Sequence, residues 1–301
     1  MADLPTTQPV ADGVLRVPVA FVNAYLVGPK GGPWVLVDTG VAGAAGWVRR
    51  AAEAHHGDAP PEAVVLTHGH FDHAGNAAAL ADHWGVPVFA HDAELPFLTG
   101  RSDYPPQDPT HAGAISFLSR FFPTSGYDLG ARVRALPPDG EVPGLHDWRW
   151  LHTPGHAPGH VSLFRESDRT LLAGDAIATA DLDSWVGVSG IPQTVARSPV
   201  PFVPDWDAAD ASVKMLAALR PRALAAGHGR EITRDAASRL AAFAERSHRP
   251  AHGRYVPQPA VFDDDAGVVS VPPPAPDRAP ALVAGGTAGA VLLSSLLHRR
   301  R

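Results

Sequence analysis

The 301-residue sequence contains no cysteine. Disulfide bonds and thiolate chemistry are therefore excluded, and any bound metal must be held by nitrogen and oxygen atoms. The 25 Lys and Arg residues are fewer than the 31 Asp and Glu residues, and the net charge of −6 predicts no basic surface for nucleic acid. The first residues lack the basic and apolar regions of a secretory signal, so we expect a soluble, cytoplasmic protein.

Against this background, one short stretch concentrates metal-binding side chains. Thr67-His68-Gly69-His70-Phe71-Asp72-His73 follows the apolar run Ala63-Val64-Val65-Leu66 and precedes a predicted helix, 74–84. An H-x-H-x-D-H spacing on a strand-to-helix turn can direct several imidazoles and a carboxylate at one point. Such ligands are typical of zinc, and also of iron or manganese.

The same pattern of an apolar strand followed by a His- or Asp-bearing turn beside glycine recurs along the chain. It appears at Thr153-Pro154-Gly155-His156, Gly174-Asp175 and Gly227-His228-Gly229. The candidate ligands are His68, His70, Asp72, His73, His156, Asp175 and His228. Seven groups are too many for one tetrahedral ion. We expect two divalent ions that share a bridging hydroxide, with the ligands divided into His68, His70 and His156 for one ion, Asp72, His73 and His228 for the other, and Asp175 between them.

Two further polar residues are predicted to support these ligands. Asp38-Thr39-Gly40 follows an apolar strand and superficially resembles an aspartic protease turn, but that chemistry requires a second such turn. The nearest candidate, Asp183-Ser184-Trp185, lacks the glycine. Asp38 is therefore interpreted as a carboxylate behind the ligands or as a turn-former. His160 is predicted to hold a ligand by a hydrogen bond.

Together, these motifs resemble the metallo-β-lactamase superfamily over roughly residues 10–246. The resemblance implies an α+β fold, a four-layer αββα sandwich with metals at one edge. Within the superfamily the chain is most similar to bacterial metallo-hydrolases near glyoxalase II and the acyl-homoserine lactonases. It implies a dinuclear hydrolase, most simply with two Zn²⁺ ions, acting on a small-molecule ester, lactone or thioester. Asp72 would bind the second metal and either orient the attacking water or protonate the leaving group. The substrate, the native metal and the oligomeric state stay open.

Competing interpretations have distinct signatures. A persulfide dioxygenase-like enzyme would use one iron held by two His and an Asp, which would leave the second ligand set idle. A serine hydrolase would need a Gly-x-Ser-x-Gly turn, and the nearest match, residues 187–191, ends in Ile191. A non-catalytic metal-binding scaffold is the third alternative, and substitution of Asp72 would test it.

The sequence also predicts three regions along the chain. Residues 1–248 form the hydrolase domain, in which an irregular, aromatic insertion at 92–144 lines the substrate cleft. A helix is expected over 110–122 within this insertion, and the last helix over 231–246. Residues 249–280 contain eight prolines and are predicted to be an extended linker. Residues 281–301 form a weakly apolar tail with a basic end; its uncharged part, 281–297, is at the lower length limit for a membrane span, so membrane contact and a disordered tail both stay open. Deletion of residues 250–301 is expected to leave activity intact.

Overall fold

The computed structural model describes residues 6–187 and 192–277. The predicted tail, 281–301, lies outside this part of the chain. Among the described residues, no helix combines the length and apolar character needed to cross a membrane.

The first half of the chain forms a seven-stranded mixed sheet with the strands in sequence order. The strands are β1 (Gln8–Ala11), β2 (Val14–Val19), β3 (Val22–Val27), β4 (Val35–Val37), β5 (Ala63–Val65), β6 (Val88–Ala90) and β7 (Val133–Ala135). The strands from β1 to β4 pair antiparallel, whereas those from β4 to β7 pair parallel. The parallel strands β4 to β6 are short and wholly apolar, as expected for strands buried on both faces, whereas the edge strand β7 carries the exposed Arg134.

A second sheet of five strands packs against the first. Its order is β14 (Ala223–Ala225), β11 (Thr170–Leu172), β10 (Val161–Arg165), β9 (Leu145–His152) and β8 (Glu141–Val142). Apolar side chains from the facing sides of the two sheets, including Val37, Val65, Trp148 and Leu163, form one buried core between them. Two small hairpins, β12 (Ile177–Ala180) with β13 (Gln193–Arg197) and β15 (Val261–Asp263) with β16 (Gly267–Ser270), lie outside these sheets.

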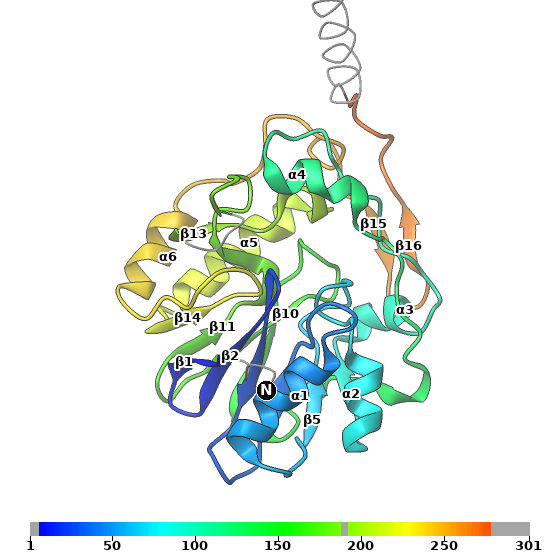
Figure 1. Ribbon diagram of the computed structural model, residues 1–301. Coiled ribbons are helices and arrows are strands. Elements are labelled where there is room, and N and C mark those ends of the chain that lie inside the picture. Colours follow the sequence, from blue (N-terminus) through cyan, green and yellow to red (C-terminus); the bar gives the residue numbers. More distant parts are fainter. Residues whose placement is uncertain (1–5, 188–191, 278–301) are drawn as a thin grey trace, which may run out of the picture.

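Helices cover the outer face of each sheet (Figure 1). α1 (Ala45–His56) and α2 (Ala77–Trp84) share a core with the seven-stranded sheet, and α5 (Trp206–Ala218) and α6 (Ala236–Ala244) share another with the five-stranded sheet. Each helix has one apolar stripe that must be buried, and the outer faces of the sheets provide the apolar surface against which it packs. The predicted α+β, four-layer αββα architecture is thereby confirmed.

The insertion at 92–144, which is predicted to be irregular, consists of short elements. Its elements are η1 (Asp92–Glu94), α3 (Leu95–Leu98), α4 (Ala114–Leu118), η2 (Ser119–Phe121) and η3 (Gly130–Arg132), before β7 and β8. A helix was expected over 110–122. Gly113 has a φ of 120°, which a right-handed helix does not allow, so α4 begins only at Ala114.

Residues 249–277 differ from the predicted extended linker. Tyr255 and Ala260 are buried in a cluster with Val200, Val203 and Trp206, and Phe262 packs near Phe97. The prolines do not prevent this packing, because the segment contains only one short hairpin, β15–β16, and is otherwise irregular chain that needs no continuous backbone hydrogen bonding.

The sheet registers explain why the polar turns meet. Val37 lies beside Val65 in parallel strands, and Leu172 lies beside Ala225. The turns that follow each pair therefore leave the sheets at the same end. The four ligand-bearing turns are brought together at one edge of the sandwich.

Candidate metal centre

The turn after β5 is shaped by close contacts around a glycine. A Cβ atom at Gly69 would lie 2.6 Å from the Tyr104 hydroxyl oxygen and 2.8 Å from Leu98. Any side chain here would push the turn away from the insertion. His68 and His70, on either side of this glycine, direct their rings to the same point, where Nε2 of His68 lies 3.0 Å from Nδ1 of His70.

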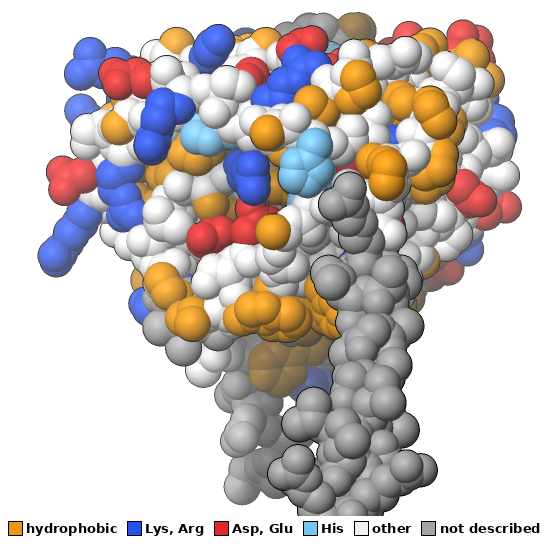
Figure 2. Space-filling model, turned by 90° about the horizontal axis from the view of Figure 1, so that it is seen from above, with side chains coloured by type: hydrophobic (Ala, Val, Ile, Leu, Met, Phe, Trp, Pro, Cys, Tyr) orange, Lys and Arg blue, Asp and Glu red, His pale blue; other side chains and the backbone are white. Residues whose placement is uncertain are grey.

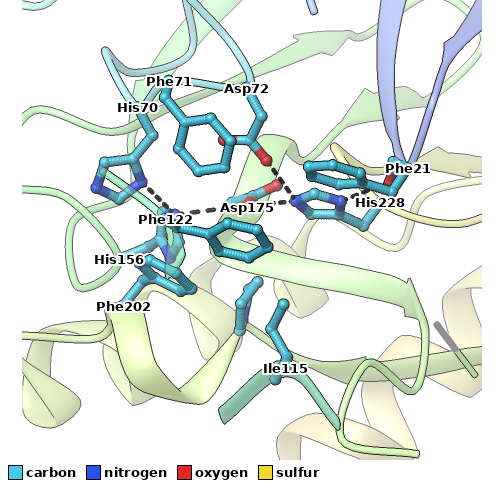
Figure 3. A pocket seen from close by; sticks show the side chains of 11 residues that line it. Phe21, His70, Phe71, Asp72, Ile115, Phe122, His156, Asp175, Phe202 and His228 are labelled. Carbon is cyan, nitrogen blue, oxygen red and sulfur yellow. Dashed lines mark hydrogen bonds and ion pairs between the residues drawn. The ribbon is translucent and has the colours of Figure 1, made fainter. Parts of the chain in front are cut away.

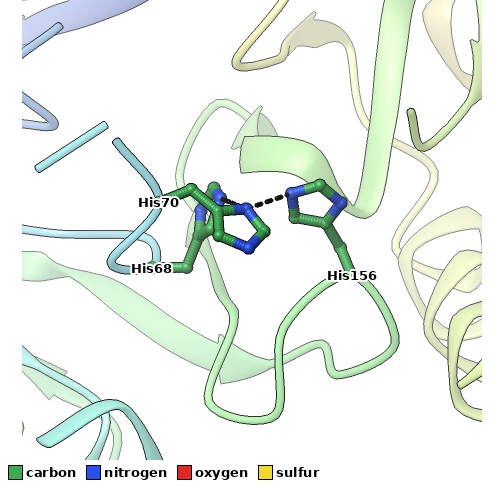
Figure 4. A group of neighbouring side chains, drawn as sticks. All are labelled: His68, His70 and His156. Atoms are coloured by element: carbon green, nitrogen blue, oxygen red, sulfur yellow. Dashed lines mark hydrogen bonds between the residues drawn. The ribbon is translucent and has the colours of Figure 1, made fainter. Parts of the chain in front are cut away.

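The first candidate ligand group consists of His68, His70 and His156 (Figure 4). The Nδ1 atom of His70 lies 2.9 Å from Nε2 of His156 and 3.0 Å from Nε2 of His68. The three rings come from the turn after β5 and from the loop between β9 and β10. Their converging nitrogens form the first ligand group that the spacing predicts.

Asp175 lies between this group and the second one (Figure 3). Its Oδ2 atom is 3.4 Å from Nε2 of His156 and 3.1 Å from Nε2 of His228. The Nε2 atom of His228 is also 3.5 Å from Oδ2 of Asp72. Asp72, His73 and His228 form a group whose ligand atoms lie within 4.8 Å of one another, as do His68, His73 and Asp175.

Two buried atoms at this junction are suited to binding a cation. Nε2 of His73 and Oδ1 of Asp175 are 3.5 Å apart, and within the described part of the chain neither has a hydrogen-bond partner. A Cβ atom at Gly227 would lie 2.0 Å from that same carboxylate oxygen, so glycine keeps the space open. Buried polar atoms without partners are costly, and a metal ion held by nitrogen and oxygen would satisfy both.

The protonation preferences fit the same interpretation. Burial lowers the pKa of His70 to about 3 and holds the pKa of His68 and His156 well below that of free histidine. These imidazoles are therefore neutral, the form in which histidine binds metals.

The carboxylates of the second group attract positive charge. Burial opposes protonation of His73 and His228, but nearby carboxylates together outweigh it and raise the pKa of both: Asp175 most strongly, with Asp72 and, for His73, Asp38. Burial likewise opposes ionisation of Asp175, but His228 and His73 hold the pKa of its carboxyl well below the usual range. A divalent cation bound here would take the place of the histidine protons.

Polar partners fix the orientation of the ligand rings. Oδ2 of Asp38 accepts hydrogen bonds from Nδ1 of His73 and from the Thr67 hydroxyl, each 2.8 Å long, and Oδ1 accepts from the Thr67 backbone N–H. Nδ1 of His156 lies 2.9 Å from the Ser198 hydroxyl, and Nδ1 of His228 donates to the Phe21 carbonyl oxygen over 2.8 Å. Such partners hold a ring in position and leave its other nitrogen for a metal.

His160 lies behind the ligands. Its Nε2 atom accepts a 2.8 Å hydrogen bond from the backbone N–H of Asp175, and its Nδ1 atom lies 2.8 Å from the Thr153 hydroxyl. Burial lowers the pKa of His160 to about 3, so the ring is neutral and able to accept. The structure thus places His160 and Asp38 against the ligand set, where the sequence predicts them, and brings all seven predicted ligands together.

Sequence reasoning missed a buried carboxylate that joins two ligand-bearing segments. Glu94, which is fully buried, accepts hydrogen bonds from the backbone N–H of Gly69 at 2.9 Å and of Gly159 at 2.8 Å, and from the Tyr104 hydroxyl. Burial raises the pKa of Glu94 to about 7. The Tyr104 ring in turn packs on His70, with centroids 4.3 Å apart. Nothing in the local sequence around Glu94 signals this role, because two of its three donors are backbone groups of distant segments.

A cleft opens directly onto the ligands (Figure 3). It encloses about 300 Å³, including the part open to solvent, and it is lined by the ligands His70, Asp72, His156, Asp175 and His228 together with Phe21, Phe71, Ile115, Phe122, Pro199 and Phe202. The predicted insertion contributes Ile115 and Phe122 to this wall. Its other aromatic residues differ in role: Tyr104 is buried behind His70, and Phe117 and Phe121 are exposed.

Comparisons with known proteins agree with this geometry. The sequence profile of the Metallo-beta-lactamase superfamily matches residues 17–228. The chain is 41% identical to "Probable metallo-hydrolase YflN" of Bacillus subtilis (strain 168) over 227 residues, which cover 74% of this chain and 86% of that protein. It is 28% identical to the hydroxyacylglutathione hydrolase GloC of Haemophilus influenzae over 114 residues, or 38% of this chain and 49% of that protein.

A solved structure supports the fold. A B3 metallo-beta-lactamase with an active-site glutamic acid superimposes with a TM-score of 0.57 at 23% identity, covering 82% of this chain and 89% of that chain. The profile match includes every candidate ligand, from His68 to His228. The chain therefore belongs to the metallo-beta-lactamase superfamily and is a probable metallo-hydrolase.

Proposed function

We propose that the protein is a dinuclear metal-dependent hydrolase that cleaves an ester, lactone or thioester. The observation that carries this proposal is the pair of ligand groups that meet at Asp175, where Nε2 of His73 and Oδ1 of Asp175 are buried without a hydrogen-bond partner among the described residues. His68, His70 and His156 would hold one ion, Asp72, His73 and His228 the other, and Asp175 would contact both. Zn²⁺ is the simplest candidate for this donor set, with iron or manganese as alternatives.

The reaction follows from the residues around the cleft. Divalent ions held there would activate a water molecule near neutral pH and polarise the carbonyl group of the substrate. Hydrolysis would join the water oxygen to the carbonyl carbon and break the carbon–oxygen or carbon–sulfur bond, and the alcohol or thiol would leave with a proton. Asp72 lines the cleft 3.5 Å from His228, a position from which its carboxylate can orient the attacking water or transfer that proton.

The absence of cysteine and the position of the ligands support hydrolysis without a protein nucleophile. The names of the relatives point the same way, since YflN is called a probable metallo-hydrolase and GloC a hydroxyacylglutathione hydrolase. A mononuclear iron dioxygenase would leave part of the ligand set unused, and that alternative is separable by experiment.

The test is to measure metals per chain on untreated protein and then to assay the same sample against aryl esters, lactones and thioesters. We expect two metal ions per chain, loss of turnover after chelation, and recovery when Zn²⁺ is restored. Asp72→Ala should lower kcat/KM at least 100-fold, because a ligand and the proton-handling carboxylate are lost together. Asp58→Ala, at an exposed position, is the control.

Three results would contradict the proposal. Turnover that survives in Asp72→Ala would remove the catalytic assignment. A single iron per chain with oxygen uptake would favour the dioxygenase. Two tightly bound metals with no turnover of any of the three substrate classes would favour a metal-binding scaffold.

A further inference from the structure

Four phenylalanine side chains from separate parts of the chain form one wall of the cleft, which we name the aromatic wall: Phe21, Phe71, Phe122 and Phe202. Phe122 lies at its centre, with ring centroids 6.0 Å from Phe21, 5.1 Å from Phe71 and 6.2 Å from Phe202. Ile115 extends the wall on the side of the insertion (Figure 3). The candidate ligands His70, Asp72, His156, Asp175 and His228 also line the cleft.

The wall is tied to the metal centre through both chain and ring contacts. The Phe21 ring stacks on His228 with centroids 6.1 Å apart, and the Phe21 carbonyl oxygen accepts the hydrogen bond from Nδ1 of that histidine. Phe202 lies 5.9 Å from His70 and 6.3 Å from His156, centroid to centroid. A group bound at the ligands would therefore contact the aromatic wall directly.

No cationic side chain lines the cleft among the residues that the structure describes. The sequence contains only two lysines, Lys30 and Lys214, and neither lines it. Two arginines of the neighbouring segments are already paired: Arg197 with Asp183 at 2.7 Å and Arg120 with Asp277 at 2.8 Å. A carboxylate on the substrate would thus lose water at the wall without gaining a charged partner, which is costly.

Resting on the proposed hydrolase function, we infer that the cleft accepts a short, uncharged alkyl or aryl group next to the scissile carbonyl and discriminates against anionic groups at that position. The space of about 300 Å³ includes the part open to solvent, so the enclosed part is smaller and favours a short group. We expect Phe122, contributed by the insertion, to have the largest effect on this preference, because its ring lies next to the other three rings of the aromatic wall.

Phe121 provides a matched control for Phe122. It is the preceding residue in the chain, but 73% of it is exposed and it does not line the cleft. The face shown in Figure 2 carries apolar side chains scattered among charged ones. Because the Phe121 ring is exposed and does not line the cleft, its removal should leave the cleft unchanged. Phe121→Ala and Phe122→Ala therefore separate a general loss of aromatic surface from loss of the wall.

The first measurement is binding without turnover. Butanohydroxamate and succinic monohydroxamate carry the same metal-binding head, but the second replaces the terminal methyl group with a carboxylate. On the Zn²⁺-loaded full-length protein, titration calorimetry should give at least tenfold tighter binding of butanohydroxamate. Phe122→Ala should weaken that binding about tenfold, Phe121→Ala should not change it, and Phe122→Lys should reverse the preference between the two probes.

The second measurement is turnover of aryl acetate and aryl butyrate against an aryl hemisuccinate. The uncharged esters should have the higher kcat/KM, and Phe122→Lys should narrow the difference. Zinc content equal to that of the wild type shows that each variant folds, and Phe122→Leu replaces Phe122→Ala if the latter loses metal. A hydroxamate preference without any ester turnover would sustain the inference and overturn the proposed function. Equal binding of both hydroxamates, or the same loss in both alanine variants, would overturn the inference even if esters are hydrolysed.

Discussion

At the scale of single residues, Asp38 illustrates how one side chain can organise a site without lying in the cleft. Its φ of 58° is a left-handed conformation that aspartate tolerates better than most residues. From there the carboxylate accepts hydrogen bonds from Thr67 and His73 on the neighbouring strand end. The cost of the backbone conformation is offset by three buried hydrogen bonds, which fix both the ligand ring and the turn that carries it.

His56 provides a residue-scale prediction about stability. The ring is buried, stacks on Trp34 with centroids 4.4 Å apart, and among the described residues neither ring nitrogen has a hydrogen-bond partner. Burial, with a smaller effect of His55, lowers the pKa of His56 from 6.5 to about 4. The folded state thus favours neutral His56, so its contribution to stability is complete above pH 6.5 and is lost as the pH falls towards 4.

The measurement compares wild type with His56→Phe, which keeps the stacked ring but cannot titrate. In urea unfolding of the metal-free proteins, the wild type should lose on the order of 1 kcal/mol relative to the variant between pH 7 and pH 4.5. Effects of the other histidines cancel in this difference. A constant difference across the range would show that the His56 ring is protonated equally in the folded and unfolded chains.

At the scale of elements, the metal centre depends on loops that different strands position. The Glu94 carboxylate, on η1, joins the turn after β5 to the loop between β9 and β10 through Gly69 and Gly159. Glutamine in its place has one NH₂ group, which must face a buried backbone N–H. Glu94→Gln therefore leaves at least one donor without an acceptor, at a cost of about 1–3 kcal/mol.

We expect Glu94→Gln to lower zinc affinity about 10–100-fold, the range found when the supports of metal ligands are removed. The readout is competition with a chromophoric chelator, together with the melting temperature. Tyr104→Phe, which removes one of the three donors to Glu94, should have a smaller effect. Glu166→Gln, at an exposed position, should have none. A lowered melting temperature with unchanged zinc affinity would mean that Glu94 supports packing but not the ligands.

The sequence predicted the elements whose signals are local. Apolar strands followed by His, Asp and Gly turns identified the parallel core strands and all seven candidate ligands, because spacing along the chain determines these features. Glu94, Ser198 and Phe21 were missed because their partners lie between 25 and 207 residues away in the sequence and are often backbone atoms. The last helix was predicted over 231–246, but Asp235 has a φ of 55° and Ile232 pairs with Leu224, so α6 begins only at Ala236.

At the scale of the whole molecule, the segment 249–277 is linked to the candidate metal centre through the packing of α5. Tyr255 and Ala260 are buried against Trp206 and Ala209 of α5. The start of α5 packs in turn on the loop that carries His156: the Asp205 backbone N–H donates to the Gly155 carbonyl oxygen, and the Ser212 hydroxyl donates to that of Pro154. A Cβ atom at Gly155 would lie 2.5 Å from Ala209, so helix and loop are in close contact.

This arrangement predicts different results for two truncations. Deletion of residues 281–301, which lie outside the described part of the chain, should leave zinc content and turnover unchanged. Deletion of residues 250–301 should expose the apolar cluster around Trp206, lower the melting temperature by about 5 °C or more, and weaken zinc binding by loosening the His156 loop. This expectation replaces the one drawn from the proline-rich sequence alone, under which both deletions would be harmless. Thermal unfolding and metal analysis of the two proteins distinguish these outcomes, since equal behaviour of both truncations would mean that residues 250–277 do not support the metal centre.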